Sequence, residues 1–488
     1  MATVVTDAGA LSGHTVPGGR ADRPIEHFGG VPYASAARFE RPGPVAAWAG
    51  VRDAARAGEA PPQRTEGLEL VPGMTPERTS EDCLQAEIWT PSLDGRRAII
   101  VWIPGGSFRI GGASLATYDG RHLAADGDVV VIGLNYRLGV LGFLAADGVP
   151  SNLGLRDLLA GIEWIRAHAT IFGGDPDRIV LMGESAGAGA ITHLLTRPDL
   201  PVAGAIVMSG SATMTQDLTR ARLVADHVAS LAGGPVLERL EGLDIESVLD
   251  LQALAVQELA ASAGMMPFHP WVDGDIVPAA PLDAASLDAL APIPLVIGTT
   301  AHEMELFRSM VPSLPAAYAE PYLLGKAGPL GLTAAGVTAG FAACDGDLVT
   351  AIADIDLVLP SIAIARSHAR RGLPVWRTRF TWEGPGHRAC HAIDLPFHFG
   401  TLDVAGWRAF AGAEGAEAGS ADRLSARLRA AWSAFATTGR PACEPIGEWP
   451  GYDGATGAIE LGADVVAGDD PDAGRWGSWA MNEHARTS

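Results

Sequence analysis

Continuous apolar runs along the chain predict a set of buried strands. These runs do not alternate with polar residues, which is typical of strands covered on both faces. They lie at residues 98–103, 128–134, 179–182, 205–208 and 294–298. Helix-like segments stand between several of them. Buried strands that alternate with helices predict an α/β fold with a mostly parallel sheet.

Helical periodicity is clearest in residues 155–168. Its apolar positions fall near one face: Leu155, Leu158, Leu159, Ile162 and Ile165. Residues 216–265 and 313–372 are rich in alanine and leucine, and residues 424–436 predict one further helix. We interpret the long helical segments as additions to the sheet. The sequence therefore predicts a single domain over residues 1–488, with helical insertions at about 216–270 and 305–372.

One stretch predicts a strand, a sharp turn and a helix around a serine. Pro176 and Asp177 give a turn signal, residues 179–182 form the apolar strand, and Gly-Glu-Ser-Ala-Gly follows at 183–187. A serine at such an apex lies on a strained turn that exposes its hydroxyl. The bare pattern is weak in a chain with 60 glycines, so a plain glycine-rich turn is the alternative.

Composition excludes some functions. The chain has 488 residues, 48% of them hydrophobic, which indicates a folded globular protein. A net charge of −22 argues against binding to nucleic acid or to an anionic membrane. The N-terminus has no secretory signal pattern, and the most apolar stretch, residues 129–145, is interrupted and too short to span a bilayer.

Four cysteines lie far apart without metal-ligand spacing: Cys83, Cys344, Cys390 and Cys443. We expect free thiols in a reducing compartment. The cysteines thus predict a cytoplasmic protein. We also expect a small-molecule partner and a monomer or homodimer. It predicts no metal, no cofactor, no nucleic-acid partner and no membrane contact.

Six segments stand in order along the chain: 28–34 (Phe-Gly-Gly-Val-Pro-Tyr-Ala), 80–84 (Ser-Glu-Asp-Cys-Leu), 135–139 (Asn-Tyr-Arg-Leu-Gly), 172–176 (Phe-Gly-Gly-Asp-Pro), 183–187 (Gly-Glu-Ser-Ala-Gly) and 395–400 (Leu-Pro-Phe-His-Phe-Gly). Together, over about residues 8–455, they resemble the type B carboxylesterase family of α/β-hydrolases. The similarity is to bacterial members of the para-nitrobenzyl esterase type rather than to cholinesterases. It implies a central, mostly parallel, twisted sheet flanked by helices.

The resemblance implies a catalytic triad. A serine hydroxyl needs a base to take its proton, and a histidine base needs an acid to orient it. In α/β-hydrolases the chain order is serine, acid, histidine. Ser185 matches the nucleophile, Glu303 the acid and His391 the base. Glu305 is the local competitor of Glu303. Two more histidines lie close in sequence: we expect His398 beside core aromatics and His387 on the approaching loop.

The same resemblance implies an oxyanion hole formed by the backbone N–H groups of Gly106, Ser107 and Ala186. A simple strand-end turn at residues 104–108 is the alternative for the first two. Glu184, next to the serine, is expected to favour the positively charged form of His391.

The resemblance also implies residues that stabilise the fold without taking part in catalysis. The resemblance pairs Arg38 with Glu81 and Arg137 with Asp157. The family's disulfide at Cys83 has lost its partner, because Pro61 or Pro62 stands at the upstream cysteine position. Residues 61–82 contain no tryptophan, so choline esters are not expected as substrates.

The predicted function is that of a serine carboxylesterase that hydrolyses small to medium carboxylic esters through an acyl-enzyme on Ser185. The alternatives are an acyl or carbamoyl transferase or an amidase with the same triad, and a non-catalytic binding protein. Loops and helices at residues 61–80, 216–270 and 305–330 are expected to form the pocket walls. The candidate wall residues, which could instead pack the core, are Phe108, Glu184, Met265, Met266, Phe268, Leu306, Phe307, Met310 and Leu314.

Overall fold

The computed structural model describes residues 2–19, 23–65, 70–210, 212–263 and 266–479. The chain divides into two compact units. Unit 1 comprises Met1–Glu69, Gly73–Leu181 and Thr215–Ala279, and unit 2 comprises Leu70–Pro72, Met182–Met214 and Ala280–Ser488. The expectation of a single domain over residues 1–488 stays a prediction.

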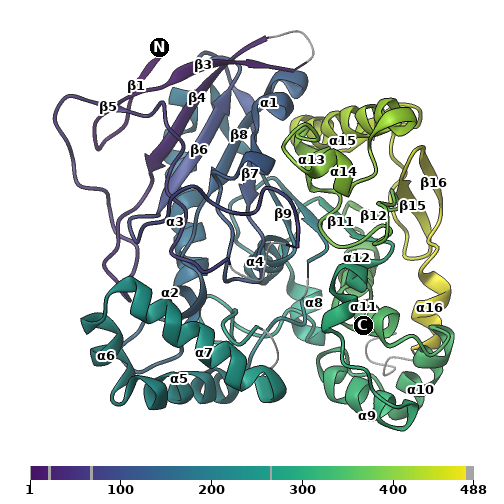
Figure 1. The fold of residues 1–488 in the computed structure, drawn as a ribbon. Helices are drawn as coiled ribbons and strands as arrows, with labels where there is room; N and C mark the ends of the chain where they lie inside the picture. The colour runs from purple at the N-terminus through teal and green to yellow at the C-terminus, as the bar shows by residue number, and fades with distance from the viewer. Residues whose placement is uncertain (1, 20–22, 66–69, 211, 264–265, 480–488) are drawn as a thin grey trace. The chain divides into compact units, whose positions relative to one another are not determined.

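A mixed sheet of eleven strands forms the framework (Figure 1). In unit 1 the strand order is β9-β7-β8-β6-β4-β3, and in unit 2 it is β16-β15-β12-β11-β10-β9. The strands are β3 (His14–Gly18), β4 (Arg23–Pro32), β6 (Gln85–Thr90), β7 (Arg97–Ile103), β8 (Val130–Leu134), β9 (Gly174–Glu184), β10 (Gly204–Met208), β11 (Leu295–Thr300), β12 (Val375–Phe380), β15 (Thr456–Leu461) and β16 (Val465–Asp469).

Strand pairing explains the apolar runs. β7 pairs parallel with β8, and β10, β11, β12 and β15 pair parallel in succession. β3, β4, β6 and β8 pair antiparallel, as do β15 and β16. Every residue of β8, β10 and β11 is buried, as expected for parallel strands covered on both faces. The predicted α/β-hydrolase framework is confirmed, with antiparallel strands toward its edges.

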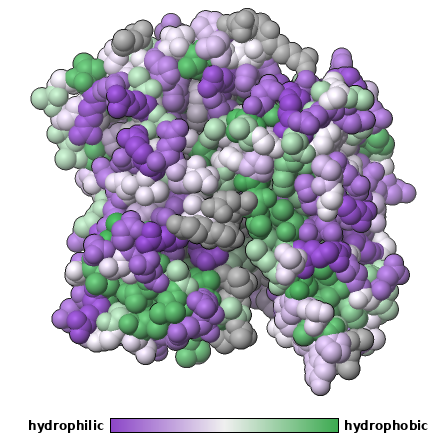
Figure 2. All heavy atoms as spheres, in the orientation of Figure 1, coloured by the Kyte–Doolittle hydropathy of each residue, from purple (hydrophilic) through white to green (hydrophobic). Residues whose placement is uncertain are grey.

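Unit 1 adds helices to its strands. They are α1 (Arg121–Gly127), α2 (Gly139–Phe143), α3 (Leu153–His168), α5 (Leu218–Ala232), α6 (Val236–Gly242) and α7 (Ile245–Ala263). A separate small sheet joins β1 (Thr3–Val5), β2 (Ala10–Ser12) and β5 (Val51–Asp53). Figure 2 shows hydrophobic side chains gathered over helices α5–α7, where Leu218, Leu223 and Leu254 are exposed.

Both predicted ion pairs are present in unit 1. Arg38 bonds both carboxylate oxygens of Glu81. Arg137 Nη2 lies 2.7 Å from Asp157 Oδ1, and both side chains are buried. Buried charges persist when they are paired and hydrogen-bonded. These pairs therefore brace the loops that carry them.

Unit 2 surrounds its strands with further helices. They are α4 (Ala186–Leu194), α8 (Ala284–Ala289), α9 (Ala316–Lys326), α10 (Ala334–Ala343), α11 (Leu348–Ala353), α12 (Leu359–Arg370), α13 (Leu395–Phe399), α14 (Trp407–Phe410), α15 (Ala418–Thr438) and α16 (Ala473–Ser478). Among the described residues, one helical stretch, Leu348–Arg370, has the length and apolarity of a membrane span, but 83% of its most apolar window is buried. A core helix meets the same criterion.

One local expectation was wrong. The turn predicted at Pro176 and Asp177 lies inside β9, where the side chain of Asp175 accepts the N–H of Asp177. Strand β12 was not predicted, because two arginines interrupt its apolar residues. Arg377 is buried and lies 3.2 Å from Asp472, so pairing allows the charge into the strand.

Candidate active site

Ser185 lies at the apex of a tight turn between β9 and α4. Its φ of 55° and ψ of −125° are uncommon for a residue with a side chain, and its N–H donates to Met208 O at 3.0 Å. Gly183 permits the turn, because an added Cβ would lie 2.8 Å from the carbonyl carbon of Gly187. The local geometry is therefore that of a strained serine turn.

Two hydrogen bonds link Ser185, His391 and Glu303. The Ser185 hydroxyl lies 2.8 Å from His391 Nε2, and His391 Nδ1 lies 2.7 Å from Glu303 Oε2. All three residues are buried and belong to unit 2. Nucleophile, base and orienting acid within hydrogen-bond reach form the geometry needed to activate a hydroxyl.

The backbone holds the acid and the base in place. Glu303 follows strand β11, and its Oε1 accepts the N–H of Thr300 at 2.8 Å. The N–H of His391 donates to Glu303 O at 3.1 Å. The contact with Thr300 could not be read from side-chain patterns, because its donor is a main-chain group.

The residues that could compete with Glu303 as the acid or with His391 as the base contact other partners. Glu305 is paired with Arg308 at 2.8 Å. His387 lies 2.9 Å from Phe410 O and stacks on that ring. His398 Nε2 lies 3.0 Å from Asp394 Oδ2, and Trp432 donates to His398 Nδ1. The structure thus brings Glu303 and His391, rather than their competitors, to Ser185.

Glu184 adds a second carboxylate beside His391. Its Oε1 lies 3.2 Å from His391 Nε2, within ion-pair distance, but this oxygen makes no hydrogen bond among the described residues. Burial raises the pKa of Glu184 above its ordinary value. Burial alone would lower the pKa of His391, but Glu184, Glu303 and Asp394 outweigh it and raise that pKa. These carboxyl groups therefore stabilise the positively charged form of the imidazole, which burial alone would disfavour.

The predicted oxyanion residues lie in constrained backbone. In unit 1, Gly106 has a φ of 119°, and a Cβ there would lie 2.3 Å from Ile110 O. Ser107 and Phe108 each have a φ of 56°. In unit 2, Ala186 is the first residue of α4, where helix N–H groups have no partner within the helix.

Comparison with known proteins decides the family. The model of the carboxylesterase family matches residues 1–320. The chain belongs to the carboxylesterase family. It is 34% identical to the para-nitrobenzyl esterase of Bacillus subtilis, covering 96% of each chain. It is 31% identical to the fumonisin B1 esterase of Sphingopyxis macrogoltabida, covering 95% of this chain and 87% of that one.

Solved carboxylesterases share its fold. A thermophilic para-nitrobenzyl esterase superposes with a TM-score of 0.84 at 31% identity, covering 98% of this chain and 99% of that chain. A carboxylesterase of Geobacillus stearothermophilus gives a TM-score of 0.84 at 30% identity, covering 98% and 100%. The predicted family and carboxylic ester hydrolase activity are therefore confirmed.

The residues of this carboxylesterase that were expected to line the pocket differ in their contacts and in their burial. The ring of Phe307 lies 5.6 Å from that of His391, so it is a neighbour of the candidate base. Phe108 packs edge-to-face on Phe143, and Phe268 is buried, as expected of core residues. Met310 is 46% exposed, which suits a surface position better than a pocket wall. Met265 lies outside the described residues.

The carboxylesterase has neither a disulfide nor a cluster of metal ligands among its described residues. All four cysteines are free and buried, including Cys83. Within the described ranges, no group of three or more histidine, cysteine or acidic side chains is placed to bind a metal ion. The expectation that no cofactor is needed stays a prediction.

Proposed function

We propose that Ser185 is the nucleophile of this carboxylesterase, His391 its general base and Glu303 the acid that orients His391. The supporting observation is the pair of hydrogen bonds, 2.8 Å and 2.7 Å long, that links the three side chains. The hydrogen bond to Glu303 holds the proton on Nδ1, so Nε2 is free to accept the serine proton.

The reaction proceeds in two halves. Ser185 Oγ attacks the ester carbonyl while His391 takes its proton, and His391 then gives the proton to the departing alcohol. Water, activated by His391, hydrolyses the acyl-enzyme and releases the carboxylic acid. Gly106, Ser107 and Ala186 are proposed to donate N–H groups to the oxyanion. Their strained or helix-terminal backbone supports this role.

The proposed substrates are carboxylic esters of small to medium size. Phe307, beside His391, is a candidate wall of the acyl pocket. A transferase or amidase with the same triad would differ only in the acceptor or leaving group. A non-catalytic binding protein is not supported, because all three triad positions are filled. We further propose a cytoplasmic monomer or homodimer without a cofactor.

The test is hydrolysis of para-nitrophenyl esters of increasing acyl length by wild type and Ser185→Ala. Wild type should cleave short and medium esters, and the variant should lose at least about a thousandfold in kcat. Equal rates for the two proteins would refute Ser185 as the nucleophile. Product analysis with added alcohols or amines separates hydrolysis from acyl transfer.

A further inference from the structure

The loop that carries Gly106 and Ser107 also carries a cationic side chain, that of Arg109. The backbone folds Arg109 back onto the start of this loop, because its N–H donates to Gly106 O at 3.0 Å. The N–H of Ile110 donates to the same oxygen at 2.9 Å. Arg109 therefore lies within one turn of the two residues whose N–H groups are proposed to hold the oxyanion.

Hydrogen bonds hold the loop on both sides of Arg109. On one side, Phe108 O accepts the N–H of Gly139 at 2.6 Å. On the other, the side-chain amide of Gln63 forms two hydrogen bonds of 2.8 Å with the backbone of Gly111, one to its N–H and one to its carbonyl. The backbone from which the Arg109 side chain extends is therefore fixed in advance, as a recognition site requires.

The guanidinium of Arg109 lacks a partner in the part of the chain that the structure describes. Its Nε is buried and forms no hydrogen bond, and the side chain forms neither an ion pair nor a cation–π contact there. Burial lowers the pKa of Arg109, and no carboxylate offsets that effect. This is unexpected in a chain with 57 acidic and 35 basic residues. A buried donor without a partner costs free energy, which a bound anion would recover.

Other buried arginines of unit 1 have carboxylate partners. Arg137 is paired with Asp157, and Arg156 Nη2 lies 2.6 Å from Asp275 Oδ2. Those pairs stabilise the fold. The side chain of Arg109 joins no two elements within the described ranges, so such a role does not explain why its Nε is buried. A ligand that supplies negative charge does explain it.

We propose that Arg109 is a specificity-determining residue that binds a carboxylate on the substrate. The preferred substrates are then carboxylic esters that also carry a free carboxylate, such as half-esters of dicarboxylic acids. A guanidinium matches a carboxylate through two parallel N–H donors. This inference rests on the proposed oxyanion role of the loop, because that role places Arg109 near the ester carbonyl. The chemistry is the same whether the carboxylate belongs to the acyl or to the alcohol part, and the test separates the two.

The test compares charged and neutral esters of matched length. Monoethyl adipate carries a carboxylate on its acyl part, and ethyl hexanoate is its neutral counterpart. The ester 4-carboxyphenyl butyrate carries a carboxylate on its alcohol part, and phenyl butyrate is its counterpart. Release of ethanol or of the phenol gives kcat/KM for each ester. Wild type should favour the charged ester in at least one pair, and a preference for the neutral ester in both pairs would overturn the proposal.

Replacement of the guanidinium tests the contact itself. Arg109→Gln should lower the charged-to-neutral ratio of kcat/KM in the preferred pair by about tenfold or more, mainly through KM, because a charge-assisted hydrogen bond is lost. Arg109→Lys keeps the charge without the paired donors, so its ratio should lie between those of Arg109→Gln and wild type. An equal loss for charged and neutral esters in both variants would show a structural role and contradict the assignment.

A matched control separates a contact from an effect of net charge. Arg166→Gln removes one exposed positive charge from helix α3 in unit 1, away from the loop in sequence. It should leave the charged-to-neutral ratio unchanged. A fall as large as that in Arg109→Gln would show that the overall charge of the protein, rather than Arg109, sets the preference.

The two proposals fail separately. Ser185→Ala should lose activity toward both esters of each pair, whereas Arg109→Gln should change their ratio. An active Ser185→Ala variant would count against the proposed nucleophile, while the ratio measured with the Arg109 variants would still test recognition of the carboxylate.

Discussion

The carboxylate of Glu184 lies 3.2 Å from His391 Nε2, on the nitrogen that also faces the Ser185 hydroxyl. Glu303 contacts the other ring nitrogen. A carboxyl group therefore lies against each ring nitrogen of the imidazole, although only Glu303 is hydrogen-bonded to it. In the proposed mechanism, this arrangement would stabilise the imidazolium that forms when His391 takes the serine proton.

Replacing Glu184 with glutamine should shift the pH dependence of activity. His391 must be neutral to act as a base, and Glu184 raises its pKa. Removing the charge lowers that pKa, so the acidic limb of the kcat/KM profile should move to lower pH by about 1 unit. The measurement is ester hydrolysis from pH 5 to 9. An unchanged limb would show that Glu184 does not tune His391.

Gly183→Ala should disrupt the serine turn. The added Cβ would lie 2.8 Å from the carbonyl carbon of Gly187, which is backbone and has little freedom to move. We expect a loss of about 1–3 kcal/mol in the free energy of unfolding, together with a large loss of kcat. Gly242→Ala is the control, because a Cβ there meets nothing within 4 Å. Equal stability and activity of both variants would contradict this account of the turn.

Arg137→Met should destabilise the fold by about 3–5 kcal/mol, because it leaves the buried carboxylate of Asp157 without its partner. Arg440→Met breaks an exposed pair with Glu448 and should cost less than about 1 kcal/mol. Urea unfolding followed by tryptophan fluorescence compares the two variants. A cost for Arg137→Met as small as that of the control would show that the buried pair does not brace the fold.

The four cysteines should not react with thiol reagents in the native protein. All four are free and buried, and burial raises the pKa of each thiol, which suppresses the reactive thiolate. A thiol reagent should label none of them before denaturation and all of them after it. Addition of a reducing agent should leave the melting temperature unchanged. A lower melting temperature under reduction would indicate a disulfide.

Sequence motifs singled out three residues that the structure links by hydrogen bonds, but they did not reveal the residues around them. Ser185, Glu303 and His391 were assigned by their motifs, and the turn at Gly183 follows from residue size alone. Strand β12 was missed because a buried arginine looks like a surface residue until its partner, Asp472, is placed beside it. That partner lies far along the chain, so only the fold reveals the pair.

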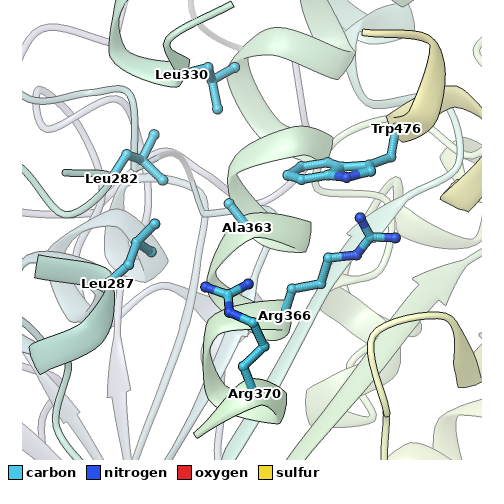
Figure 3. Close-up of a pocket in the computed structure, with 7 residues that line it drawn as sticks. All are labelled: Leu282, Leu287, Leu330, Ala363, Arg366, Arg370 and Trp476. Atoms are coloured by element: carbon cyan, nitrogen blue, oxygen red, sulfur yellow. The ribbon is translucent and has the colours of Figure 1, made fainter. Parts of the chain in front are cut away.

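A small pocket in unit 2, drawn in Figure 3, shows the same limit. Its wall combines residues near 282–287, 330, 363–370 and 476, and no local pattern unites them. Met310, whose apolar character suggested a pocket wall, is 46% exposed in the structure. Apolarity identifies residues that can be buried, whereas the surrounding elements decide which of them are.

The most direct test of the account is to map the site of covalent modification by a para-nitrophenyl phosphate triester. The reagent phosphorylates an activated serine: the serine oxygen attacks phosphorus, and para-nitrophenolate leaves as the P–O bond to it breaks. The account predicts one modified peptide, labelled at Ser185, with loss of esterase activity in proportion to labelling and no labelling of folded Ser185→Ala. Full inactivation with Ser185 unmodified, or an active Ser185→Ala variant, would contradict it.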